Sequence, residues 1–330
     1  MVRSGCRHPP HGWQLRLFGQ IMSIEMLTIS IRFALYANLM LLFGWPLFAV
    51  YALPAEDSTF APSRRTLAWL TITAFSFSLA GIVAMAAAMD GSTFIQVDRA
   101  TVAEMVFETP MGTAWQARMA ALGLLLATMI VGSSRRQPAV VLTSMTAAIA
   151  LASLAWTGHG AAGEGAVGWL QLVADMTHLL AAGAWIGALF AFVILLSRVS
   201  REQTADRLAI AHTALARFSM VGTVVVVLLV STGLITSWIL VGPGQVFDLF
   251  KSDYGILLSV KLLMFAAMLG LAAMNRFRLT PILGRLIDTS ASPSDAFAAL
   301  RRSVAVETAI AGTILVVVAW LGTLAPPMAN

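Results

Sequence analysis

The stretch Trp156–Gly187, with the sequence WTGHGAAGEGAVGWLQLVADMTHLLAAGAWIG, decides how this chain folds. It is apolar enough to lie in a bilayer, yet it carries four titratable residues, which are His159, Glu164, Asp175 and His178. Charged or titratable side chains are costly in hydrocarbon, so a protein that keeps them there usually uses them. We therefore expect a buried bundle helix whose polar side chains carry the function.

The apolar part of this stretch predicts one helix with a single polar face. If a helix begins at about Gly168, residues three, four or seven positions apart lie on the same face, and the polar residues on that face form a stripe. The stripe consists of Gln171, Asp175, His178 and Trp185. The remaining faces carry Leu, Val, Ile and Ala. Gly183 and Gly187 form a small-xxx-small pair, which lets a neighbouring helix approach closely.

The composition indicates an integral membrane protein. Of the 330 residues, 58% are hydrophobic and only 11% are charged, whereas about a quarter of the residues in a soluble domain are charged. The basic residues are almost all arginines, which in a membrane protein report topology and do not indicate nucleic-acid binding. The two lysines, Lys251 and Lys261, do not follow a glycine, so there is no phosphate-binding loop. Cys6 is the single cysteine, which excludes a disulfide or thiolate cage within the chain.

Apolar runs predict an all-α, polytopic fold with eight transmembrane helices, each near the ~20 residues that a span needs. The expected spans are 29–53, 67–89, 112–132, 138–157, 168–196, 215–241, 254–275 and 303–323. We divide the chain into an irregular N-terminal tail (1–27), a first half with spans one to four (28–157) and a second half with spans five to eight (158–330). The tail lacks the pattern of a signal peptide. Met22 and Met26 are plausible starts, so the tail need not be native.

Arginines alternate between the connections and predict the topology. The connections after spans two, four and six are acidic or nearly uncharged, whereas those after spans one, three, five and seven are rich in arginine. The arginines are Arg64, Arg65, Arg135, Arg136, Arg198, Arg201, Arg207, Arg276, Arg278, Arg285, Arg301 and Arg302. The positive-inside rule places these connections in the cytoplasm, with both termini on the outer side.

Asp175 and His178 form the strongest candidate pair. They lie three residues apart, so their side chains are neighbours on a helix, and a carboxylate can orient an imidazole. The alternative is a buried polar pair that ties helices together. His159, between two glycines, and Glu164 lie at the expected outer surface, where His159 could equally be a solvated loop residue. An outer histidine followed by a deep one has the layout of a cation path.

Methionines form a second candidate group on the outer side. They are Met85, Met89, Met105 and Met111. Thioether is a soft ligand that suits Cu(I), and imidazole suits copper in either valence. The alternative is that these methionines fill gaps between helices.

Three further charged residues lie inside predicted spans. Arg118 and Lys261 are close enough to the outer ends for their side chains to snorkel to the headgroups. Glu307 lies near the inner end, where an ion pair with Arg301 or Arg302 would be a structural explanation.

Several segments resemble the bacterial copper resistance D (CopD/PcoD) family of inner-membrane proteins. These segments are TPMGTAWQARMAAL (109–122), GHGAA (158–162), DMTHLLAAGAWIGAL (175–189), DYGILLSVKLLMFAAMLGLAAMNRFRL (253–279) and LRRSVAVETAIAGTILVVVAWLGTLAPP (300–327). The resemblance implies a multi-pass protein of the bacterial inner membrane with periplasmic termini. It also implies copper (Cu⁺ or Cu²⁺) import or homeostasis without enzymatic activity, often beside a periplasmic carrier of the CopC type. It supports His159, His178, Lys261, Asn275 and Glu307 as motif positions.

Two other functions remain open at this point. A b-type cytochrome could hold haem between two deep histidines, although only His178 is expected to be deep. A copper-delivery factor for a cuproenzyme would use the same residues as a transporter.

Overall fold

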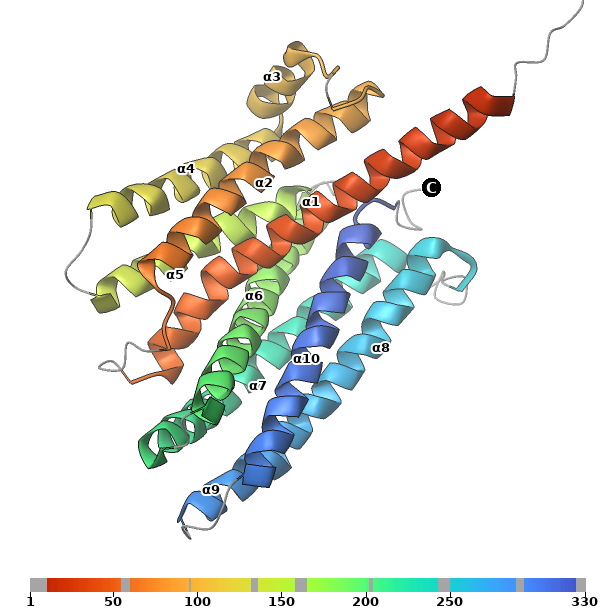
Figure 1. Ribbon diagram of the computed structural model, residues 1–330. Coiled ribbons are helices and arrows are strands. Elements are labelled where there is room, and N and C mark those ends of the chain that lie inside the picture. Colours follow the sequence, from red (N-terminus) through yellow and green to blue (C-terminus); the bar gives the residue numbers. More distant parts are fainter. Residues whose placement is uncertain are drawn as a thin grey trace, which may run out of the picture.

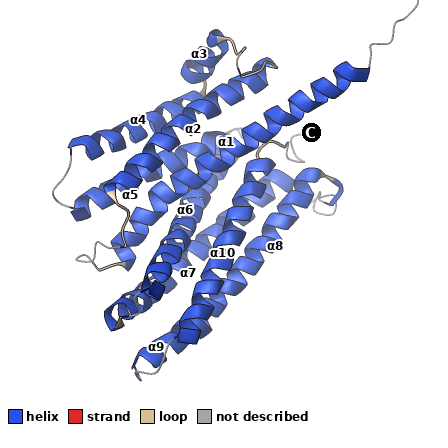
Figure 2. Ribbon diagram, in the orientation of Figure 1, coloured by secondary structure: helices blue, strands red, loops and turns tan. Residues whose placement is uncertain are grey.

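In a computed structural model, the described part of the chain consists of helices joined by short turns and loops, without strands (Figures 1 and 2). It comprises residues 11–54, 60–94, 96–131, 136–157, 165–201, 204–242, 250–288 and 294–324. The helices are α1 (His11–Ala52), α2 (Arg64–Asp90), α3 (Arg99–Glu108), α4 (Pro110–Val131), α5 (Arg136–Ala152), α6 (Gly165–Arg201), α7 (Ala205–Val241), α8 (Asp253–Met274), α9 (Thr280–Asp288) and α10 (Ser294–Leu321). Within these ranges, eight helical segments are long and apolar enough to cross a membrane. The predicted all-α fold with eight spans is confirmed.

Helix α1 differs from the expected boundary between tail and first span. It begins at His11, directly after Pro9 and Pro10 in the sequence, and its N-terminal part projects past the other helices (Figure 1). Residues 11–27 contain no proline, so nothing in the backbone chemistry interrupts the helix before the span. Residues 1–10 lie outside the described residues.

The seventh span continues beyond the predicted end near residue 275. A π-helical turn at Asn275–Leu279 joins α8 to α9, so the continuous segment runs from Asp253 to Leu286. The backbone N–H of Thr280 donates to the carbonyl of Asn275, five residues earlier. Pro281 has no N–H and would clash with the carbonyl four residues back in a regular helix. The wider turn that precedes it lets the helix continue through this proline.

Helices α1 and α6 cross in direct backbone contact. A Cβ added to Gly187 would meet the backbone of Gly44 and Trp45, and one added to Gly44 would meet the backbone of Gly183. Gly183 itself faces Phe43 of α1 and Leu151 of α5. The sequence-based expectation that Gly183 and Gly187 admit a close neighbour is therefore confirmed, and the neighbour is α1.

The substitution Gly187→Ala should destabilise the bundle. The new methyl group would meet backbone atoms of α1, which cannot rotate away as a side chain can, so the two helices must separate. We expect a loss of about 1–3 kcal/mol, the range for overpacked cores, measured as a lower thermal unfolding midpoint in detergent. The matched control is Gly270→Ala in α8, where a Cβ meets nothing within 4 Å. An equal midpoint for the two variants would contradict the proposed contact.

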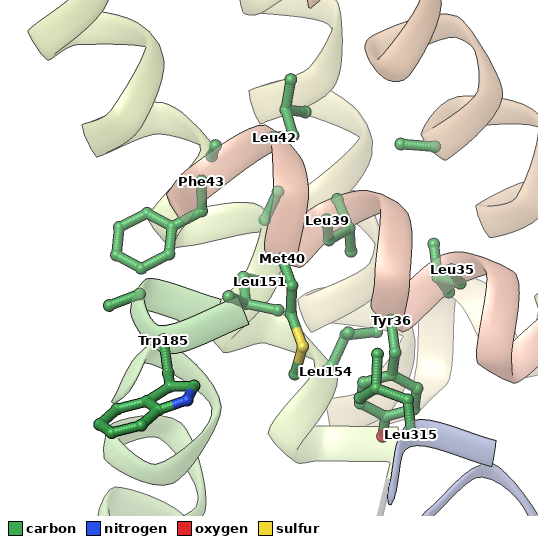
Figure 3. Packing of buried hydrophobic residues seen from close by; sticks show 14 of the residues in the cluster. Leu35, Tyr36, Leu39, Met40, Leu42, Phe43, Leu151, Leu154, Trp185 and Leu315 are labelled. Carbon is green, nitrogen blue, oxygen red and sulfur yellow. The ribbon is translucent and has the colours of Figure 1, made fainter. Parts of the chain in front are cut away.

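The largest core cluster joins the two halves of the chain. Figure 3 shows Leu39, Met40 and Phe43 of α1 with Leu151 of α5 and Trp185 of α6. These side chains are 8% exposed or less, which makes α1 the helix around which both halves pack. The central position of α1 fixes α6, and with it the polar stripe, against the rest of the bundle.

An even number of spans places both ends of the chain on the same side, and the start of α1 and the end of α10 lie at the same end of the bundle (Figure 1). Which side that is remains the prediction from the arginine alternation. Reporter fusions after Arg136, Arg207 and Arg285 should all read cytoplasmic. A periplasmic signal from any of the three would contradict the assigned orientation.

Candidate functional site

Polar side chains gather where α6 packs against α7, and a lysine of α8 lies close enough to interact with them electrostatically. Helix α6 contributes Asp175 and His178, which are both partly buried. Helix α7 contributes two threonines, Thr232 and Thr236, which hydrogen-bond to them. Helix α8 contributes Lys261, whose charge interacts with both Asp175 and His178. We call these five residues the polar seam.

The hydrogen bonds of His178 define which ring nitrogen carries the proton. Its Nδ1 lies 2.9 Å from Oγ1 of Thr232. The Thr232 hydroxyl donates its single proton to the carbonyl of Leu228 at 2.6 Å, so its oxygen accepts from the His178 Nδ1–H. This assignment leaves the lone pair of a neutral imidazole on Nε2. A partner that fixes the tautomer in this way is the usual companion of a metal-binding histidine.

The Asp175 carboxylate is also held by α7. The Thr236 hydroxyl donates to its Oδ1 at 3.0 Å, and the carboxylate interacts electrostatically with Lys261. Tyr254, near the start of α8, lies close enough to interact with the same carboxylate. The seam therefore combines one carboxylate and one imidazole on α6 with one amine on α8 that interacts electrostatically with both. Lys261 faces the seam from α8, so the snorkelling explanation is not needed for it.

The stripe predicted on α6 continues from His178 to Trp185, about 10 Å further along the helix. Trp185 is only 3% exposed and makes an edge-to-face contact with Phe218, with ring centroids 5.7 Å apart. Gln171, at the other end of the stripe, is also buried. The stripe thus faces the bundle interior along its whole length.

A second polar pair lies near Trp185. Nδ2 of Asn275 donates to Oε2 of Glu307 at 3.0 Å, and both residues are buried. The sequence-based expectation for Glu307 is an interfacial ion pair with Arg301 or Arg302, but its side chain is only 2% exposed and its carboxylate accepts from Asn275, so it does not lie at the interface. The Arg301 guanidinium donates to Ser200. Asn275 sits at the first residue of the π-helical turn, which directs it toward α10.

This pair borders a cavity of about 290 Å³ between α6, α7, α8 and α10. The walls are mainly apolar and include Trp185, Phe218 and Leu269, with Asn275 and Glu307 among the polar exceptions. The cavity and the polar seam are two separate features, connected by the face of α6 that carries His178 and Trp185.

The four methionines predicted as copper ligands are not among the residues that form the seam. Met105 is buried in an apolar cluster with Ile82 and Val106, and Met89 is 70% exposed. Met85 and Met111 line a separate small cavity with Arg118. His159 and Glu164 lie outside the described residues. Within the described ranges, no group of three or more His, Cys, Asp and Glu residues could hold a metal ion. The ligand roles of all these residues stay predictions.

Two functional partners were missed by sequence reasoning, Thr232 and Thr236. Their spacing of one helical turn in an otherwise apolar span is the signal that could have found them. What they contact could not be read from that spacing.

Two family models match most of the chain. The model of the copper resistance protein D-like N-terminal domain matches residues 22–169, and the model of copper resistance protein D matches residues 212–321. The chain is 37% identical to "Copper resistance protein D" of Pseudomonas syringae pv. tomato over 307 residues, which are 92% of this chain and 98% of that protein.

Two further relatives are more distant. "Inner membrane protein YebZ" of Escherichia coli (strain K12) is 25% identical over 90% of this chain and 98% of its own length. "Copper transport protein CutJ" of Bacillus subtilis (strain 168) is 30% identical over 53% of this chain and 32% of its own length. No solved structure matches the chain.

Proposed function

This chain belongs to the copper resistance protein D family, and on that premise we propose that it imports copper ions from the periplasm toward the cytoplasm through the polar seam. The protein is a multi-pass protein of the bacterial inner membrane. In this proposal copper is the cargo, no reaction is catalysed, and His159 and Glu164 receive the ion at the periplasmic surface, where a carrier of the CopC type would deliver it.

The observation that carries the proposal is the orientation of His178. Nδ1 of this buried imidazole is bound to Thr232, so in the proposal Nε2 is the atom whose lone pair binds the incoming cation. Imidazole is a ligand for copper in either valence. A polar pair that only tied helices together would need no free lone pair, whereas a metal ligand does.

The charges around His178 suit transient binding of a cation. Asp175 supplies a negative charge that attracts copper, and Lys261 offsets that charge when the ion is absent. A site with one imidazole and one carboxylate holds a copper ion less tightly than a closed cage of four ligands, and a transport site must release its ion. Beyond His178 in the direction of Trp185, the carboxylate of Glu307 on α10 is the next group that could meet the ion.

The test is copper uptake by proteoliposomes that contain the purified protein and a trapped copper-sensitive dye. Uptake above that of protein-free liposomes is the expected result. Copper binding without uptake would replace transport with delivery to a cuproenzyme.

Nothing in the described residues favours haem binding. His212, the second histidine with a described side chain, lies beside Gly284, twenty residues before Thr232 on α7. That separation corresponds to about 30 Å along the helix, so His212 and His178 cannot both ligate one iron. A haem absorbance band in the purified protein would overturn this conclusion.

A further inference from the structure

A small cavity in the first half of the chain contains a buried arginine. The cavity measures about 50 Å³ and lies between α1, α2, α4 and the 3₁₀ turn Ser153–Thr157. Its polar lining includes Arg32 and Tyr36 of α1, Ser78 of α2 and Arg118 of α4. Arg118 is only 2% exposed, so it does not snorkel to the headgroups as its position near the span end would allow.

Several N–H and O–H groups of the lining residues lack hydrogen-bond partners within the described residues. Nε and Nη1 of Arg118 have no hydrogen-bond acceptor there, and neither has Nε of Arg32. The hydroxyl of Ser78, whose side chain is 1% exposed, is also without a partner. The indole of Trp115, another lining residue, is satisfied, because its Nε1 donates to the carbonyl of Ser78 at 3.0 Å. A buried guanidinium group with two N–H groups that lack acceptors is unfavourable, so the cavity favours an acceptor with negative charge.

The size and the donors of the cavity define that acceptor. About 50 Å³ exceeds the roughly 10–15 Å³ that one water molecule needs. The lining includes two arginines, of which Arg32 also packs against Gly322, and three hydroxyl-bearing residues, Tyr36, Ser78 and Thr157. All of these groups can donate hydrogen bonds, whereas the thioethers of Met85 and Met111 are weak acceptors. Among the described residues, the lining has two arginines and, unlike the polar seam, no carboxylate to offset their charge, so it favours an anion over a copper ion.

We propose that this cavity is an anion site that binds one small inorganic anion of the size of chloride between Arg118, Arg32 and the hydroxyl of Ser78. The anion neutralises Arg118 and ties α4 to α1 and α2, which stabilises the first half of the bundle. The proposal does not depend on copper import, because the cavity shares no residue with the polar seam.

The experiment compares the purified protein in chloride and in gluconate at equal ionic strength, in a zwitterionic detergent. Gluconate is too large for the cavity, so a bound chloride should raise the thermal unfolding midpoint by several degrees through mass action. Equilibrium dialysis with radiolabelled chloride should show saturable binding of about one ion per chain. The substitution Arg118→Gln should abolish the chloride-dependent shift and weaken binding at least tenfold.

The control is Arg64→Gln, an exposed arginine on α2 whose guanidinium donates to the carbonyl of Ile130. It should keep both the shift and the binding. Should Arg118→Gln fail to fold, Ser78→Ala provides the second test, since it removes one donor and should weaken chloride binding severalfold. Equal midpoints in the two salts, together with no chloride binding by the wild type, would overturn the proposal. Unchanged binding by Arg118→Gln or Ser78→Ala would overturn it as well.

Discussion

The substitution His178→Ala should abolish copper uptake while the protein stays folded in the membrane. Alanine removes the Nε2 lone pair, which is the only imidazole ligand in the described part of the seam. The Thr232 hydroxyl keeps its hydrogen bond to the carbonyl of Leu228, so no buried donor on α7 is left without a partner. Uptake into proteoliposomes should fall to the level of protein-free liposomes, and the thermal unfolding midpoint should change by only a few degrees.

The matched control is His212→Ala, which removes the partly buried histidine beside Gly284, far from the seam. It should take up copper like the wild type. Wild-type uptake by His178→Ala would reject His178 as a copper ligand and leave the methionines as the better candidates.

The substitution Asp175→Asn should reduce copper uptake about a hundredfold with little change in stability. An amide oxygen can still accept the hydrogen bond from Thr236, so the packing between α6 and α7 is retained. What is lost is a negative charge, worth ~3 kcal/mol for a unit cation at ~5 Å with an effective dielectric constant of ~20. Lys261, now without its counter-charge, would repel the ion further.

A double variant tests whether the unbalanced charge of Lys261 causes part of the loss of uptake in Asp175→Asn. Asp175→Asn combined with Lys261→Met removes both charges, so it should recover part of the uptake that Asp175→Asn loses. The control is Asp206→Asn at the exposed start of α7, which should behave like the wild type. Uptake by Asp175→Asn within about twofold of the wild type, less than 0.5 kcal/mol, would show that the carboxylate plays no part in attracting copper.

Much of the fold could be predicted from local patterns. The number of spans follows from the length and apolarity of each segment, because a helix must satisfy its backbone hydrogen bonds within the hydrocarbon. Helix boundaries were less predictable. Pro281 suggests an end to span seven, yet the helix continues to Asp288 because a π-helical turn accommodates the proline. The short helix α3 between spans two and three was also not predicted.

The candidate site shows the same division. Asp175 and His178 could be identified because titratable residues stand out in an apolar helix, and helical periodicity places them on one face with Trp185. Their partners could not be identified in this way. Thr232 lies 54 residues from His178, and Asn275 lies 32 residues from Glu307. No local pattern relates residues so far apart.

By itself the sequence determined an eight-span helical membrane protein of the copper resistance protein D family, with one polar stripe on its fifth span and a small-residue face at Gly183 and Gly187. Only the tertiary structure decided that this face meets Gly44 of α1, that Thr232 pairs with Nδ1 of His178, and that Nε and Nη1 of Arg118 are enclosed without an acceptor among the described residues. Hydropathy and periodicity are properties of single helices, whereas these contacts arise when helices pack and each polar group must find a partner away from water.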